Sequence, residues 1–273
     1  MHRIIDSHVH LSQRREDALI QFARKNDLRY TLDELLSTMR RCNVGRGLLL
    51  SPPLKGGAPL PNTEVIRLCM KSRGRLDPVL TVEPTIKKVK AAVRLAEENR
   101  RYVKAFKIRL GYVKASAESH MFNALYDYAE SERLPVLFHT GDTAFSNGSL
   151  ARSHPLLLDG LANRREELKI VLCHFGNPWF EDVAELIYKH PNVYADISGL
   201  ITGGAYAAEY ARWLARKISE AIYYAGGAEK VIFGTDYPIT KHSDALALVK
   251  SLEVEENDRQ KILWGNAKRV FGL

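Results

Sequence analysis

The sequence has no run of about 18 uninterrupted apolar residues, although 45% of its 273 residues are apolar. A membrane-spanning helix is therefore not expected. The N-terminus also lacks the basic segment and apolar core of a secretory signal, because Asp6, His8 and His10 interrupt its first apolar stretch. These absences predict a cytoplasmic protein without a membrane partner.

Cysteine is scarce as well. The three cysteines, Cys42, Cys69 and Cys173, are far apart, odd in number and form no CxxC pair. This pattern excludes a disulfide framework, and we expect buried, reduced thiols.

Glycine-rich phosphate motifs and flexible linkers are also missing. The chain contains neither G-x-G-x-x-G nor a Walker sequence, which argues against dinucleotide and P-loop sites. Without a Pro- or Ser-rich linker, we expect one continuous domain spanning residues 1–273. The Pro/Gly-rich stretch 51–62 is short enough to be a loop over a site.

The formal charge is +8 and the sequence pI is about 9.3, which raises the possibility of a nucleic-acid partner. The basic residues, however, are dispersed and mostly interleaved with acids, as in "ANRREELK", and no basic-aromatic stripe is visible. We therefore expect no nucleic acid, and a positive field that attracts an anionic small molecule.

Short apolar runs alternate with longer amphipathic stretches along the whole chain, which predicts parallel strands covered by helices. Eight such units in about 250 residues are typical of a single (β/α)8 TIM barrel. A doubly wound open sheet is the alternative, but it commonly carries a glycine-rich turn after its first strand. The expected strands are 3–11, 44–52, 76–84, 103–110, 134–142, 169–177, 192–200 and 230–238, and the expected helices are 31–42, 61–73, 85–100, 118–132, 179–190 and 206–225, followed by two short helices in 258–273.

Histidines stand where a barrel places its functional groups, at the carboxyl ends of the strands. His8 and His10 end the first expected strand, and Val9 between them should face the helical layer. His139 ends the fifth strand, His174 the sixth and Asp236 the eighth. The remaining histidines, which we expect at the surface, are His2, His120, His154, His190 and His242.

Imidazoles that converge with a carboxylate predict a divalent metal site. One Zn²⁺ suits these ligands best, and manganese, iron or cobalt also fit them. Such an ion lowers the pKa of a bound water to about 7, so that hydroxide forms at neutral pH.

With these residues the chain resembles the amidohydrolase superfamily, and specifically the amidohydrolase-related family that includes aminocarboxymuconate-semialdehyde decarboxylase. The resemblance runs nearly end to end and implies a metal-bearing (β/α)8 barrel. It rests on "IIDSHVHL", "AFKIRL", "PVLFHTG", "IVLCHFGNPWFEDVAELIYKHPNVYADISG", "VIFGTDYP" and "ILWGNAKRVFGL".

The resemblance assigns roles residue by residue. It implies that His8, His10, His139 and Asp236 hold one metal, and that Asp236 also handles the proton of the water. His174 matches a histidine that acts as acid/base in mononuclear members. Barrels of this family often associate, so a homo-oligomer is expected.

Lys107 ends the fourth strand, where binuclear relatives carry a carboxylated lysine between two metals. A cationic Lys107 is the interpretation we favour, because Arg109 shares its strand face and the two can hold a substrate carboxylate. Solvated charges at the barrel rim are the alternative. Asp142 and Asp196 are candidates for orienting imidazoles.

The sequence therefore predicts a metal-dependent hydrolase that acts on an amide, ester or lactone of a small carboxylate-bearing substrate. The short loops favour hydrolysis, because the decarboxylases of the family use loop insertions to enclose aromatic acids. Decarboxylation of an unsaturated or aromatic acid is the second hypothesis. A non-catalytic metal-binding barrel and a metal-dependent deoxyribonuclease are further alternatives.

Overall fold

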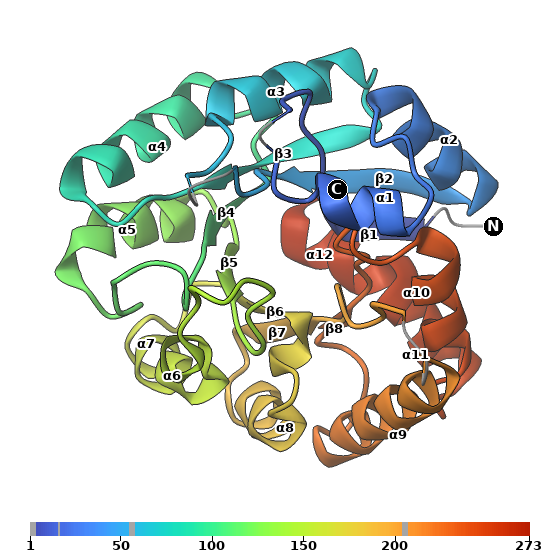
Figure 1. Cartoon of the computed structure of the whole chain (residues 1–273). Coiled ribbons are helices and arrows are strands. Elements are labelled where there is room, and N and C mark those ends of the chain that lie inside the picture. Colours follow the sequence, from blue (N-terminus) through green and yellow to red (C-terminus); the bar gives the residue numbers. More distant parts are fainter. Residues whose placement is uncertain (1–3, 16, 55–57, 204–206) are drawn as a thin grey trace.

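The computed structural model describes residues 4–15, 17–54, 58–203 and 207–273. Their eight strands form one parallel sheet in sequential order, with each strand paired to the next along the chain (Figure 1). This topology confirms the predicted (β/α)8 barrel. The strands are β1 Ile4–His10, β2 Val44–Leu50, β3 Leu76–Thr81, β4 Ala105–Ile108, β5 Val136–His139, β6 Ile170–Cys173, β7 Val193–Asp196 and β8 Val231–Ile232.

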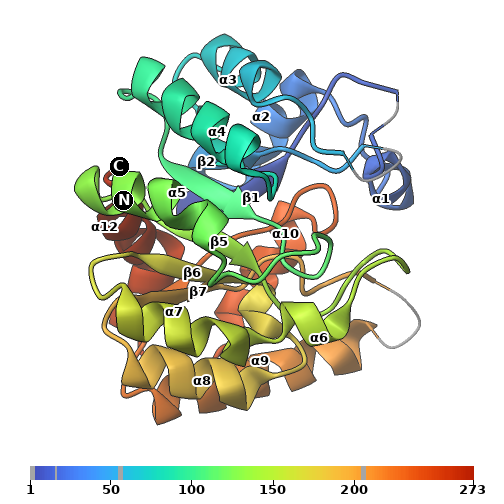
Figure 2. The same ribbon diagram turned by 90° about the vertical axis from the view of Figure 1, so that its left-hand side faces the viewer.

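The helices surround the strands (Figures 1 and 2). All six expected helices are present, and the two at the C-terminus are joined by a π turn, Lys261–Gly265. Among the described residues, no helix is long and apolar enough to cross a membrane. The helices are α1 Ile20–Lys25, α2 Leu32–Arg41, α3 Asn62–Lys71, α4 Ile86–Glu98, α5 Asn123–Ser131, α6 Leu150–Ser153, α7 Asp159–Arg164, α8 Phe180–Lys189, α9 Ala207–Tyr224, α10 His242–Lys250, α11 Glu256–Gln260 and α12 Asn266–Phe271.

Four helices, α1, α6, α7 and α10, were not predicted. They have 6, 4, 6 and 9 residues, and helical periodicity needs a window of about 11 residues to be recognised. Local capping explains the sharp start of two predicted helices. The hydroxyls of Thr31 and Thr85 accept hydrogen bonds from the backbone N–H of Glu34 and Lys88 at the starts of α2 and α4.

The core has an inner and an outer layer. Inside the barrel, side chains such as Leu48, Val79 and Leu137 are fully buried, and Phe271 of α12 packs against the same cluster. In Figure 2, α12 lies at the end of the barrel opposite α1 and α6. The outer layer lies between strands and helices. All three cysteines are free as expected, but Cys42 is half-buried rather than buried.

The barrel closes where β1 meets the segment that follows β8. The N–H of Ser7 donates to the carbonyl of Phe233 at 3.0 Å, and the N–H of His10 donates to that of Tyr237 at 2.8 Å. In return, the N–H of Asp236 donates to the carbonyl of His8 at 2.7 Å. These bonds bring the histidines of β1 alongside Asp236.

The carboxylate of Asp6 secures this seam from within. It is fully buried, and its Oδ1 accepts the N–H groups of His8 and Thr235, each at 3.0 Å. Its Oδ2 accepts the hydroxyl of Thr235 at 2.6 Å and lies 3.2 Å from Nε2 of His242. Only the closed barrel brings all of these donors to the buried carboxylate. Without the carboxylate, each donor would be left unpaired.

We expect Asp6→Ala to lower the free energy of unfolding by about 3–5 kcal/mol, because buried donors lose their charged acceptor. The measurement is urea denaturation followed by circular dichroism. Asp33→Ala, an exposed position in the first turn of α2, is the matched control and should cost no more than about 1 kcal/mol. Equal midpoints for the two variants would contradict the role of Asp6.

Candidate metal centre and active site

The predicted site residues come to one cavity from four strand ends. His8 and His10 lie at the end of β1, and His139 ends β5. His174 follows β6 directly, and Asp236 follows β8. All five line a cavity of about 340 Å³. The cavity is thus at the end of the barrel where functional groups of this architecture gather.

Strand alternation places the two histidines of β1 on the same side. Their ring centroids are 5.1 Å apart, and both rings line the cavity. Val9 points to the opposite side, where it is fully buried in a cluster that includes Leu35 and Met39 of α2. This arrangement confirms that Val9 faces the helical layer.

An acceptor oxygen faces Nδ1 of each β1 imidazole. Nδ1 of His10 lies 3.0 Å from the carbonyl oxygen of Leu50, which can only accept. Nδ1 of His8 lies 3.1 Å from Oδ2 of Asp196, also an acceptor. With hydrogen on Nδ1, each neutral ring satisfies its acceptor and keeps the lone pair of Nε2 for a cation.

Those two Nε2 atoms face the carboxylate of Asp236. Oδ1 of Asp236 is 3.0 Å from Nε2 of His10 and 3.5 Å from Nε2 of His8. Within the described chain this buried oxygen has no hydrogen-bond partner. Electron pairs that face one another in this way repel unless a positive charge lies among them, so the donor set of His8, His10 and Asp236 fits a divalent cation.

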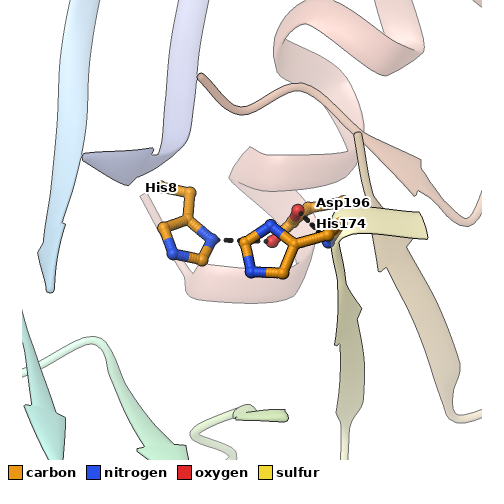
Figure 3. Close-up of side chains that lie close together, drawn as sticks. All are labelled: His8, His174 and Asp196. Atoms are coloured by element: carbon orange, nitrogen blue, oxygen red, sulfur yellow. Dashed lines mark hydrogen bonds and ion pairs between the residues drawn. The ribbon is translucent and has the colours of Figure 1, made fainter. Parts of the chain in front are cut away.

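A second group of potential ligands, His8, His174 and Asp196, shares His8 with the first (Figure 3). Asp196 is fully buried and is not part of the cavity lining. Its Oδ1 accepts the N–H groups of His174 and Ser198 at 2.9 and 3.0 Å, and its Oδ2 faces His8. With these oxygens occupied, Asp196 is suited to orient imidazoles. Asp142 contacts His139 through its backbone carbonyl, at 2.9 Å from Nε2, rather than through its carboxylate.

The rings of His139 and His174 lie beside the β1 histidines at tilted angles. Their ring centroids are 4.8 Å apart, and the His174 ring is 5.1 Å from that of His8. Because Nε2 of His139 donates to Asp142, its Nδ1 is the nitrogen with a lone pair. Nδ1 of His174 faces the carbonyl of Ser198 at 3.1 Å, which leaves the lone pair on Nε2. Neither of the two three-ligand groups found in the described residues includes His139.

Burial favours the neutral form of the imidazoles of His8, His139 and His174 by lowering their pKa values. Burial lowers the pKa of His174 to about 4, and burial together with the charge of Lys107 lowers the pKa of His8. Burial and the neighbouring His174 hold the pKa of His139 well below its usual value. For Asp236, burial would raise the pKa, but His8, His10 and His174 outweigh it and lower the pKa. Neutral nitrogens and one carboxylate are the protonation states that metal binding requires.

The backbone is strained at two of these positions. His174 has φ 62° and Asp236 has φ 58°, and Phe175 next to the former has φ 48°. A left-handed conformation costs a non-glycine residue on the order of 1–3 kcal/mol and persists only where the surrounding structure enforces it. Such strain is concentrated at functional sites.

Two basic side chains, Lys107 in β4 and Arg109 directly after it, also line the cavity. Lys107 is 4% exposed, and its Nζ donates to Sγ of Cys173 at 2.7 Å. Burial lowers the pKa of Arg109, while Glu83 and Tyr112 raise it. The two side chains reach the same cavity, as their spacing on the strand predicts.

Aromatic side chains that no sequence pattern predicted complete the lining of the cavity. The ring of Tyr112 lies 4.9 Å from that of His139 and 6.2 Å from that of Phe145, measured between centroids. Burial raises the pKa of Tyr112 to about 12, so its hydroxyl stays neutral. Both residues lie in loops after strands, β4 and β5, and only that position could have drawn attention to them.

The expectation that the other histidines lie at the surface is wrong for two of them. His190 and His242 are 4% and 2% exposed, because each packs against a carboxylate, Asp159 for the former and Asp6 for the latter. His120 is exposed and His154 half-buried. His2 lies outside the described residues.

The fold and the donor set together define a (β/α)8 barrel with a metal site at the carboxyl ends of its strands. The chain belongs to the amidohydrolase family, whose sequence model matches residues 5–273. Membership of this family supports a divalent metal as the cofactor.

One curated relative is gamma-resorcylate decarboxylase of Polaromonas sp. (strain JS666 / ATCC BAA-500). It is 25% identical over an alignment of 150 residues, and the match covers 48% of this chain and 42% of the relative. The chain thus matches less than half the length of this relative.

Two solved structures share the fold over the whole chain. One is a probable 2-pyrone-4,6-dicarboxylic acid hydrolase from Acinetobacter baumannii with citric acid bound, with a TM-score of 0.72, 18% identity and 100% of both chains covered. The other is a dihydroxybenzoic acid decarboxylase from Polaromonas sp. JS666 with bound manganese and an inhibitor. Its TM-score is 0.70 and its identity 16%, and the alignment covers 100% of this chain and 98% of that one.

Metal addition should stabilise the protein, and His10→Ala should remove that effect. At a zinc concentration 100 times the dissociation constant, we expect the free energy of unfolding to rise by about 2.7 kcal/mol. Denaturation with and without ZnCl₂ after EDTA treatment measures this gain. His120→Ala, at an exposed position, should keep the full gain. A gain of equal size in His10→Ala would refute a site at this histidine.

Proposed function

We propose that the protein is a metal-dependent hydrolase that cleaves an amide, ester or lactone of a small carboxylate-bearing substrate. The observation that carries this proposal is the buried Asp236 carboxylate. Its Oδ1 faces Nε2 of His8 and of His10, in a cavity that Lys107 and Arg109 also line. The amidohydrolase family and the hydrolase among the related structures support it.

We propose that His8, His10, His139 and Asp236 hold one Zn²⁺. Three of these residues form a compact donor set, and the lone pair of His139 is on Nδ1. Neutral imidazoles and a carboxylate are suitable zinc ligands, and manganese is the alternative that the related decarboxylase structure suggests. When bound, such a cation lowers the pKa of water to about 7 and polarises a carbonyl group.

The protein side chains then supply proton transfer. Asp236, ionised in the resting site, accepts a proton from the water whose oxygen attacks the carbonyl carbon. The bond from that carbon to the leaving oxygen or nitrogen breaks, and the leaving atom takes up the proton. His174, whose ring lies next to those of His8 and His139, serves as the acid/base that passes this proton on. The products are a carboxylic acid and an alcohol or amine.

Lys107 and Arg109 bind the substrate carboxylate in this proposal. Both line the cavity, and a guanidinium offers two parallel donors to a carboxylate where an ammonium offers a point charge. The neutral rings of Tyr112 and Phe145 form an apolar wall for the rest of the substrate. A cavity of about 340 Å³ accommodates a small molecule.

Decarboxylation of an unsaturated or aromatic acid is the second candidate function. The curated relative is a decarboxylase, and the aromatic wall beside two cations would suit a planar acid. The two functions differ in what leaves the substrate. An assay of lactones, esters and amides by pH-stat, run beside an assay of aromatic acids for CO₂ release, separates them. CO₂ release without hydrolysis would replace the first proposal with the second.

We also propose that residues 1–273 form one domain that works in the cytoplasm as a homo-oligomer. One continuous eight-stranded sheet supports the single domain, and three free cysteines fit a reducing compartment. The homo-oligomer is carried over from the family resemblance, and size-exclusion chromatography with light scattering would test it.

We expect Asp236→Asn to retain part of its metal but to lose at least about 100-fold in kcat, since an amide cannot accept the proton of the attacking water. We expect His139→Ala to lose metal instead. Elemental analysis and turnover of the same preparations distinguish the two effects. Wild-type metal content in His139→Ala would contradict its role as a ligand, and unchanged turnover in Asp236→Asn would contradict the role of the base.

Arg109→Lys should raise KM by about 10-fold or more and change kcat less, because a bidentate contact to the substrate carboxylate becomes a single one. The control is a substrate analogue in which the carboxylate is a neutral amide. Wild type and variant should turn over this analogue equally well. A fall in kcat that is larger than the rise in KM would argue against carboxylate binding at Arg109.

A further inference from the structure

The two oxygens of the Asp196 carboxylate have different hydrogen-bond partners, because backbone N–H groups occupy one of them. Oδ1 accepts two backbone N–H groups, from His174 at 2.9 Å and from Ser198 at 3.0 Å. The hydroxyl of Ser198 donates to the same oxygen. Oδ2 is left to face Nδ1 of His8 at 3.1 Å (Figure 3).

We propose that Asp196 is a positioning residue that keeps the proton of His8 on Nδ1 and so leaves the lone pair of Nε2 for the metal. This inference rests on the metal site of the proposed function. The carboxylate itself is fully buried and does not line the cavity, so it acts only through the His8 ring. A carboxylate behind a ligating histidine sets the tautomer and raises the basicity of the ring.

The geometry predicts an unusual consequence of the isosteric change Asp196→Asn. Two backbone donors point at the position of Oδ1, so the amide oxygen must occupy that position. The amide NH₂ then occupies the position of Oδ2 and donates toward Nδ1 of His8. Nδ1 becomes an acceptor, and the ring proton moves to Nε2.

The new proton would close the metal site. Nε2 of His8 lies 3.5 Å from Oδ1 of Asp236, the buried oxygen without a partner. With hydrogen on Nε2, the His8 ring donates a hydrogen bond to this carboxylate. Neither atom is then available to bind the metal. One substitution outside the cavity therefore removes two ligand atoms, while the size of the side chain and the three hydrogen bonds at Oδ1 are retained.

Ser198→Ala offers a matched comparison in the same network. The serine hydroxyl lies 3.1 Å from Nδ1 of both His8 and His174, so its removal also perturbs the contacts of these rings. It leaves the carboxylate of Asp196 in place, however, and with it the acceptor for Nδ1 of His8. The tautomer and the lone pair on Nε2 should therefore be unchanged. Asp127→Asn, on an exposed face of α5, controls for the loss of one negative charge.

The experiment combines two measurements on the full-length protein. Long-range ¹H–¹⁵N correlation spectra of metal-free protein at pH 8 report the tautomer of His8, assigned by its loss in His8→Gln. Zinc affinity is measured by competition with a chromogenic chelator. We expect Nδ1–H in wild type, Ser198→Ala and Asp127→Asn, and Nε2–H in Asp196→Asn. Zinc affinity should fall about 10- to 100-fold in Asp196→Asn and by less than about threefold in the two comparison variants.

Each outcome decides the proposal. Nε2–H in the wild-type protein would overturn it even if Asp196→Asn did not fold. A folded Asp196→Asn variant that keeps Nδ1–H on His8, or one that binds zinc as wild type does, would overturn it as well. An equal loss of zinc affinity in Ser198→Ala would assign the effect to general disturbance of the network. If wild type bound no metal yet showed the predicted tautomers, the proposed function and the effect on metal binding would fail, while the control of the His8 tautomer by Asp196 would stand.

Discussion

The hydrogen-bonded seam between β1 and the segment after β8 is the constraint on which the site depends. Asp6 accepts donors from both sides of the seam, and the N–H of Asp236 donates to the carbonyl of His8. The first and last strands are about 230 residues apart in the sequence, so these contacts close a very long loop whose ordering entropy is substantial. Closing the barrel and assembling the donor set are the same event.

Closing the barrel also buries two carboxylates, which repel each other and lose their solvation by water. Asp196 and Asp236 are both buried, and the backbone at His174 and Asp236 is left-handed. Buried carboxylates are tolerated only with donors or cations around them. Asp196 has its donors from the protein, whereas Oδ1 of Asp236 does not. The stability of the fold thus holds the Asp236 carboxylate in a position where a bound cation would satisfy its free oxygen.

The cavity combines this donor set with features of a different origin. Lys107 and Arg109 come from the barrel wall, while Tyr112 and Phe145 come from loops. The wall residues share the rigidity of the strands, so they suit a role common to many substrates, such as holding a carboxylate. The loop residues can vary without disturbing the barrel, and they are suited to select the remainder of the substrate.

The sequence alone was sufficient for the barrel, because eight apolar runs with helices between them bury their surface well in only a few architectures. It also indicated His8, His10, His139, His174 and Asp236, since strand ends converge in any such barrel. It indicated Asp196 as a candidate for orienting an imidazole, but not that its partner is His8, 188 positions away. It also could not indicate that Tyr112 and Phe145 line the cavity or that His190 and His242 are buried. Those facts depend on how strands are staggered and loops fold back, which local periodicity does not encode, and only the tertiary structure decided them.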